Sequence, residues 1–154
     1  MEIYIENIQK KIEINNDIND IIERTIKESL LLERGSLNYE VSVSIVDNDE
    51  IKKLNKEYRG IDQETDVLSF PIDDDFIMEG PLLLGDIIIS GEKALEQAEE
   101  YNHSLYREIS YLTAHSMLHL MGYDHMTDDE KSIMRQKEKE IMRRLVIFKD
   151  NRSD

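Results

Sequence analysis

Three of the four histidines in the chain lie within eleven residues, HSMLHLMGYDH, at positions 115 to 125. His115 and His119 are four residues apart, so on a helix their rings leave the same face, with Cβ atoms about 5–6 Å apart, and both can bind one ion. Gly122 has no Cβ and suits the left-handed conformation that ends a helix, so the chain can turn there and return His125. The spacing therefore predicts a metal site with three histidine ligands.

Such a site would support hydrolysis. Three neutral imidazoles leave a tetrahedral Zn²⁺ ion with one open position, and a water molecule there has a pKa of roughly 7 instead of about 15.7. We expect one Zn²⁺ ion per chain, although other divalent ions could also bind. Asp124, next to His125, is a candidate to orient a ligand ring by accepting its second N–H group. His103 has no partner at ligand spacing, and we expect a structural role for it.

The spacing HxxxHxxGxxH also occurs in the metzincin proteases, in which a glutamate after the first histidine serves as general base. Here that position is Ser116, whose hydroxyl cannot take a proton from water at neutral pH. A zinc peptidase is therefore the weaker hypothesis, because it would need another carboxylate near the metal. Phosphodiester cleavage relies more on the metal as Lewis acid and on a cation that stabilises the charge developing on phosphate.

Length and composition predict one domain. A chain of 154 residues with 40% apolar content can bury a core without disulfides, so we expect a single domain over residues 1–154. The absence of cysteine excludes thiolate zinc sites, so His, Asp or Glu must hold any metal. No apolar run approaches the roughly 18 residues of a membrane-spanning helix, and the N-terminal MEIYIENIQKK does not have the pattern of a secretory signal. The expected location is the cytoplasm, with no membrane partner.

The formal charge of −15 argues against a protein that binds nucleic acid through its overall charge. An RNA partner would need a local basic patch, and the candidates on one predicted helix and its exit are Lys52, Lys53, Lys56 and Arg59. The alternative for the three lysines is a solvated helix face, the commoner role of such residues. An arginine suits phosphate because its planar guanidinium matches the phosphate oxygens.

Hydrophobic periodicity predicts the elements that must position these residues. Strands are expected over Glu2 to Ile8, Tyr39 to Ile45, Thr65 to Phe70 and Leu82 to Ser90, with a loop at Asp73 to Asp75. Helices are expected over Asn16 to Arg34, from Asp47 to about Tyr58, after Ser90, from Ser104 to Met121, and from Thr127 onward. Arg107 and Glu108 are predicted to face water, and the last helix to bury a stripe of Ile133, Met134, Ile141, Met142 and Leu145. This order predicts an α+β fold, a small sheet covered by helices.

The motif HSMLHLMGYDH resembles the HGxLHLxGYDH signature of the YbeY family. Upstream, LNKEYRGIDQETDVLSFP and LGDIIIS resemble two further blocks of that family, and the resemblance extends in order from about Val41 to Met142. It implies a zincin-like α+β domain with a small, mixed four-stranded sheet. It also implies a metal-dependent endoribonuclease that cleaves single-stranded RNA, matures the 3′ end of 16S ribosomal RNA and acts in ribosome quality control, with small-subunit ribosomal proteins as candidate further partners.

In that family the three histidines bind zinc and an arginine is functional, which the resemblance transfers to His115, His119, His125 and Arg59. Two positions depart from the family pattern. Ser116 replaces a glycine and is expected to add a hydroxyl beside the metal, while Glu64 replaces a proline and is expected to loosen its loop and add negative charge near the RNA path. The competing hypotheses are a zinc peptidase and a non-catalytic ribosome-assembly factor, whose structural metal would have four protein ligands.

Overall fold

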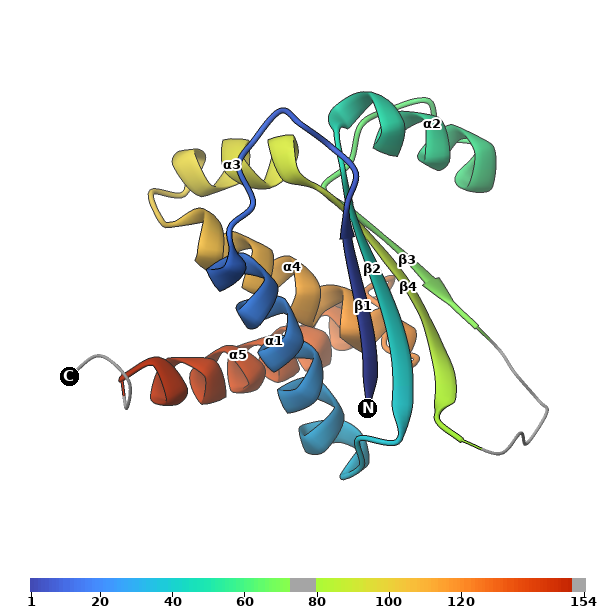
Figure 1. Ribbon diagram of the computed structural model, residues 1–154. Helices are drawn as coiled ribbons and strands as arrows, with labels where there is room; N and C mark the ends of the chain where they lie inside the picture. The colour runs from blue at the N-terminus through green and yellow to red at the C-terminus, as the bar shows by residue number, and fades with distance from the viewer. Residues whose placement is uncertain (73–79, 151–154) are drawn as a thin grey trace.

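Four strands form one mixed sheet in the computed structural model, which describes residues 1–72 and 80–150 (Figure 1). They are β1 (Glu2–Asn7), β2 (Tyr39–Val46), β3 (Val67–Pro71) and β4 (Leu82–Ser90), in the spatial order β1-β2-β4-β3. β1, β2 and β4 run parallel, and β3 pairs antiparallel with β4 at one edge. The mixed four-stranded sheet implied by the family resemblance is confirmed.

Two long helices, α1 (Asn16–Arg34) and α4 (Leu105–Leu120), pack against the sheet. Their apolar side chains meet those of β2 and β4 in the main core, which includes Ile22, Ile26, Leu30, Val43, Ile45, Ile87, Ile89, Leu112 and Met117. The last helix, α5 (Asp128–Asp150), packs on α1 and α4 through a second cluster that contains Met134, Ile141 and Leu145. This arrangement of helices on a small sheet confirms the α+β prediction.

Two shorter helices lie next to the strands that they follow. α2 (Asn48–Arg59) comes directly after β2 and packs through Ile51 against Val46 and Leu68. α3 (Gly91–Glu100) continues from the end of β4. Within residues 1–72 and 80–150, no helix has both the length and the apolar character needed to cross a membrane.

Polar caps fix the starts of the helices. Asn15, Asp47, Ser90 and Ser104 each accept a hydrogen bond from the backbone N–H group three residues later, at the start of α1 to α4. Thr127 Oγ1 accepts from the Glu130 N–H at 3.1 Å while Glu130 Oε1 accepts from the Thr127 N–H at 3.0 Å, so this reciprocal pair starts α5. The helix starts predicted at Asp47, Ser90, Ser104 and Thr127 are confirmed.

Two predictions about helix faces were wrong. Glu108 does not face water; it is 3% exposed, and its Oε1 lies 3.4 Å from Nε2 of His103. Ile133 is 49% exposed, whereas its neighbour Met134 is buried, because Ile133 lies about 100° around the helix from Met134, beyond the face that packs on α1 and α4. The loop predicted at Asp73 to Asp75 lies outside the described residues.

A close approach at Gly85 holds the end of α4 against the sheet. Gly85 of β4 has a φ of 153°, and a Cβ there would lie 2.8 Å from Leu120 Cδ2 and closer still to the Phe70 carbonyl oxygen of β3. A residue without a side chain is therefore required for the three elements to meet. The motif at the C-terminal end of α4 is thereby kept close to β3.

Candidate metal centre

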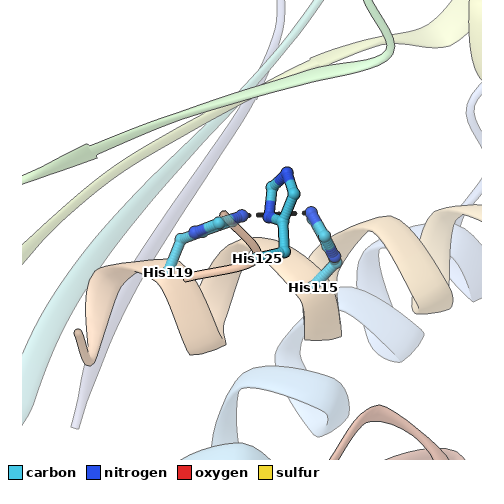
Figure 2. Close-up of side chains that lie close together, drawn as sticks. All are labelled: His115, His119 and His125. Carbon is cyan, nitrogen blue, oxygen red and sulfur yellow. Dashed lines mark hydrogen bonds between the residues drawn. The ribbon is translucent and has the colours of Figure 1, made fainter. Parts of the chain in front are cut away.

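His115, His119 and His125 converge at the C-terminal end of α4 (Figure 2). The first two project from the last two turns of α4, and His125 returns from the loop that follows. The three ring centroids are 4.7, 4.9 and 5.5 Å apart, and one nitrogen from each ring lies within 4.8 Å of the others. The structure therefore brings together the three side chains that the spacing selected.

The spacing of the ring nitrogens fits a shared metal ion. The Nε2 atoms of His115 and His119 are 3.2 Å apart. Two nitrogen ligands at about 2.0–2.1 Å from a tetrahedral ion would be about 3.3 Å apart. Within the described part of the chain, this donor group comprises three side chains, so a four-coordinate ion would keep one position for a ligand that is not protein.

Hydrogen bonds to the other ring nitrogens orient two of the three rings. His115 Nδ1 lies 2.9 Å from Glu138 Oε2, and His119 Nδ1 lies 3.0 Å from the backbone oxygen of Tyr123. A carboxylate and a carbonyl both accept, so each Nδ1 carries the hydrogen and donates it. Each Nε2 then keeps the lone pair that a metal requires.

Sequence reasoning missed Glu138 and assigned the orienting role to Asp124. Asp124 Oδ1 accepts the backbone N–H of His125 at 2.8 Å and is 4.0 Å from that ring's Nδ1, so its hydrogen bond holds the loop and not the imidazole. A signal for Glu138 did exist, because position 138 continues the apolar spacing of Met134 and Ile141 on α5 and is almost fully buried. A carboxylate in a buried stripe needs a partner, and the partner is His115.

The turn after α4 is fixed by backbone geometry and by α1. Gly122 has a φ of 99°, and the Tyr123 hydroxyl donates to Glu33 Oε2 at 3.1 Å. Arg34 also donates to the Met121 carbonyl, at 3.4 Å. These contacts hold the turn after α4 against the end of α1.

The protonation of His119 favours metal binding. Burial lowers the pKa of His119, and the neighbouring rings of His115 and His125 lower it further. Since a metal binds the neutral imidazole, a lowered pKa keeps this ring available at neutral pH.

The histidines line a pocket of about 500 Å³, and Arg59 reaches it from the end of α2. The other walls are β3 with the residues before it and the turn after α4. The ring of Tyr58 packs edge-on against Phe70 of β3, with centroids 5.3 Å apart, which fixes the end of α2 beside the pocket. Lys52, Lys53 and Lys56 are exposed on α2 and lie outside the lining.

The Ser116 hydroxyl, expected beside the metal, does not line the histidine pocket but bonds a residue that does. Ser116 is fully buried, and its Oγ shares a short hydrogen bond with Ser69 Oγ of β3. A helix residue next to His115 faces away from the His115 side, so position 116 is directed at the sheet. Ser116 therefore joins α4 to β3.

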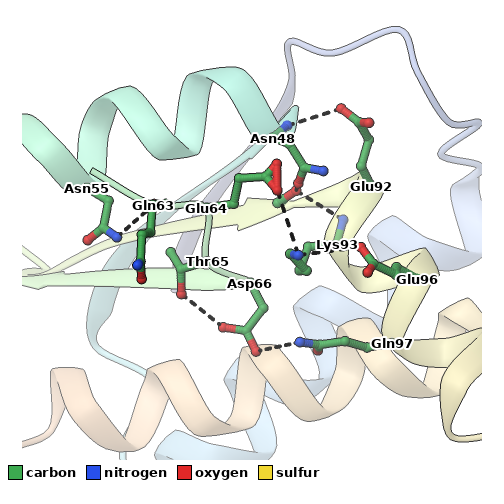
Figure 3. Close-up of polar contacts among 11 residues, drawn as sticks. Asn48, Asn55, Gln63, Glu64, Thr65, Asp66, Glu92, Lys93, Glu96 and Gln97 are labelled. Atoms are coloured by element: carbon green, nitrogen blue, oxygen red, sulfur yellow. Dashed lines mark hydrogen bonds and ion pairs between the residues drawn. The ribbon is translucent and has the colours of Figure 1, made fainter. Parts of the chain in front are cut away.

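Glu64 also differs from its expected role. Its Oε1 lies 3.8 Å from Nζ of Lys93 on α3, which offsets its charge (Figure 3). The same loop is held by Asn55 Nδ2, which donates to the Gln63 carbonyl at 3.0 Å. The loop between α2 and β3 is thus tied to two helices instead of being loosened.

The α+β fold carries a three-histidine group that could hold a metal ion, in a pocket that an arginine also lines. The family model described as Endoribonuclease YbeY matches residues 4–146, and the chain belongs to the YbeY family. The protein named Endoribonuclease YbeY in Thermoanaerobacter sp. (strain X514) is 53% identical, over 96% of this chain and 99% of that protein. Its namesake in Finegoldia magna is 51% identical over 97% of each chain. The solution structure of TM1509 from Thermotoga maritima is similar, with a TM-score of 0.61 and 29% identity over 90% of this chain and 85% of that one.

Proposed function

We propose that the protein cleaves single-stranded ribosomal RNA in the cytoplasm, using one Zn²⁺ ion bound by His115, His119 and His125. As a member of the YbeY family it is a metal-dependent endoribonuclease of rRNA maturation, a hydrolase of RNA phosphodiester bonds. The observation that carries the proposal is the convergence of three imidazole donors in a pocket that Arg59 also lines.

The side chains of the pocket divide into those that hold the metal and those that hold phosphate. When bound, Zn²⁺ would supply Lewis-acid chemistry, by polarising the scissile phosphate or by lowering the pKa of water. Glu138 keeps the ring of His115 in the tautomer that binds metal. Arg59 would hold the phosphate oxygens with its planar guanidinium and stabilise the negative charge that they gain. Asp124 would act through the His125 backbone, by holding the loop that carries this ligand.

A zinc peptidase is not favoured. Its general base would be a carboxylate of this pocket, and the described lining contains Asp66 and Asp124. Asp66 already accepts from Gln97 Nε2 at 3.3 Å and from the Val67 N–H at 2.8 Å, while Asp124 accepts from the His125 N–H. Both carboxylates hold parts of the fold around the pocket, and neither stands at position 116, where the metzincin general base lies.

A non-catalytic assembly factor with a structural metal is also less well supported. A structural zinc ion has four protein ligands. The donor group found among the described residues has three, and it opens into a pocket instead of the core.

RNA as the substrate raises the question of how a chain of charge −15 binds a polyanion. Lys52, Lys53 and Lys56 stand on the helix that ends at Arg59, so we propose that they guide RNA toward the pocket. Small-subunit ribosomal proteins that deliver the RNA are proposed as further partners.

The test is cleavage of a precursor of the 16S rRNA 3′ end by purified protein of measured metal content. His119→Ala should lose both zinc and activity, and Arg59→Ala should keep zinc but lose about 10²–10³-fold in kcat. Lys52→Ala, outside the pocket, should retain kcat. Equal cleavage by all four proteins would identify a contaminating nuclease and defeat the proposal. Analysis of the products for 2′,3′-cyclic ends then distinguishes attack by the RNA 2′-OH from attack by water.

A further inference from the structure

A second and larger cavity, of about 840 Å³, lies between the N-terminal half of α4 and the middle of α5. Its floor is formed by apolar side chains of α1 and α5, Ile21, Met142 and Leu145. We call this cavity the α4–α5 groove. Figure 1 shows the two helices crossing on the side of α4 that faces away from the sheet.

The rim of the groove is basic. Arg135, Lys139 and Arg143 recur every four residues on α5, so they share one face, and Arg107 adds a fourth cation from α4. All four are exposed. Among the described residues, Arg107, Arg135 and Lys139 have no carboxylate at ion-pair distance, whereas Arg143 pairs with Glu140 at 2.9 Å. Three cations are therefore free to bind an anion from outside.

The acidic groups of the groove are already engaged. Glu108 lies 3.4 Å from His103, and Glu138 lies 2.9 Å from His115. Both carboxylates are buried, beneath the exposed cations of the rim. In a chain with a net charge of −15, the three free cations of the rim outnumber the two engaged carboxylates, so the local charge of the groove is positive.

The groove also offers aromatic surfaces. Tyr101, at the end of α3, is 65% exposed and stacks on the ring of His103, with centroids 6.3 Å apart. Tyr111 of α4 is 39% exposed. Exposed aromatic rings beside free cations are the combination on which unpaired bases stack while their phosphates are neutralised.

The groove adjoins the candidate metal centre. Tyr111 precedes His115 by one helical turn, and their ring centroids are 6.2 Å apart. Glu138 lines the groove and bonds His115, so these side chains form the wall between the two cavities. The groove and the histidine pocket therefore meet at Glu138 and His115.

We propose that the α4–α5 groove binds the single-stranded RNA substrate several nucleotides away from the bond that is cleaved. The groove supplies phosphate contacts through Arg107, Arg135 and Lys139 and base stacking through Tyr101 and Tyr111. It compensates for the acidic character of the rest of the chain. The inference rests on the proposed function for the identity of the strand, but it concerns binding and not cleavage.

The test is fluorescence anisotropy of the zinc-loaded protein with labelled single-stranded RNA of about 16 and about 4 nucleotides, the second too short to span both cavities. Arg135→Gln combined with Lys139→Gln should weaken binding of the long RNA about tenfold and reduce its salt slope by about 1.4, the value for two lost phosphate contacts. The variant should bind the short RNA as tightly as the wild-type protein does. Lys10→Gln combined with Lys11→Gln removes the same charge from an exposed segment and serves as the control.

The stacking contribution has its own test. Tyr101→Leu should weaken binding of the long RNA about tenfold, whereas Tyr101→Phe, which keeps the aromatic face, should bind like the wild type. Equal affinity of the groove and control variants for the long RNA would overturn the proposal and leave the groove to a protein partner. Because the measurement is binding, a wild-type protein that binds RNA in the groove but does not cleave it would refute the proposed function alone.

Discussion

His115 on α4 and Glu138 on α5 are joined by a hydrogen bond of 2.9 Å between Nδ1 and Oε2. The orientation of a candidate metal ligand therefore depends on how two helices pack, through contacts such as those of Met134 and Ile141. Groups that hold the second nitrogen of a ligand imidazole fix its tautomer and raise its basicity. Folding of the last helix and assembly of the metal centre are coupled through this pair.

Glu138→Ala should weaken Zn²⁺ binding about 10–100-fold, because the His115 ring loses the acceptor that fixes its tautomer. Competition with a chromogenic chelator measures the affinity. Glu138→Gln, whose amide oxygen can still accept, should lose less. Glu140→Gln, on the same helix but outside the histidine group, is the control and should bind zinc like the wild type. Zinc affinity unchanged in Glu138→Ala would show that this residue does not orient the ligand.

Gly122→Ala should disturb the return of His125. The φ of 99° at Gly122 is strained for any residue with a Cβ, although nothing lies within 4 Å of the added atom, so the cost is in the backbone. We expect a loss of about 1–3 kcal/mol in unfolding free energy and a weaker zinc affinity. Gly35→Ala, at another open positive-φ position that ends α1, should lose stability without losing zinc affinity. Urea unfolding and chelator competition on both variants separate the two effects.

Local patterns predicted most of the elements and the three-histidine group. The helix starts were readable because Asp47, Ser90, Ser104 and Thr127 act on backbone groups three residues away. The grouping of the three histidines was predictable for the same reason, since two lie one helical turn apart and the third follows a glycine. Strand order was not predicted from periodicity, because it depends on contacts between distant segments.

The features that sequence patterns did not predict depend on tertiary contacts. Glutamate is usually found on the surface, but His103 from the preceding loop gives the Glu108 carboxylate a partner inside the protein. Ser116 was expected beside the metal because it follows His115, whereas the approach of β3 gives its hydroxyl a partner in Ser69. In each case the deciding atom belongs to another element.

The stability of the fold should depend on pH through Glu108. Burial raises the pKa of Glu108, and His103 opposes part of the rise. The folded state thus holds this proton more tightly than the unfolded chain, so the contribution is present at pH below the ordinary pKa of a glutamate and is lost as pH rises through the folded pKa. Glu108→Gln cannot ionise. It should therefore gain stability relative to the wild type as the pH rises through the folded pKa of Glu108.

Urea unfolding at several values from about pH 4 to about pH 8 tests this, using the difference between the two proteins so that titrations unaffected by Glu108 cancel. In a His103→Gln background the pKa of Glu108 should rise further, and the difference should grow. A difference that stays constant with pH in both backgrounds would contradict the prediction.

Tyr123 contributes to the metal centre through its backbone and to stability through its side chain. Its carbonyl accepts from His119 Nδ1 at 3.0 Å, while its hydroxyl donates to Glu33 Oε2 at 3.1 Å. Tyr123→Phe should cost about 1–3 kcal/mol of unfolding free energy, because Glu33 loses a donor in a largely buried place. Zinc affinity should stay near the wild-type value, since the carbonyl remains and Lys137 still holds Glu33 at 3.2 Å. Tyr4→Phe, at an exposed position, is the stability control, and a Tyr123→Phe protein that keeps its stability but loses zinc would reverse the assignment of the two roles.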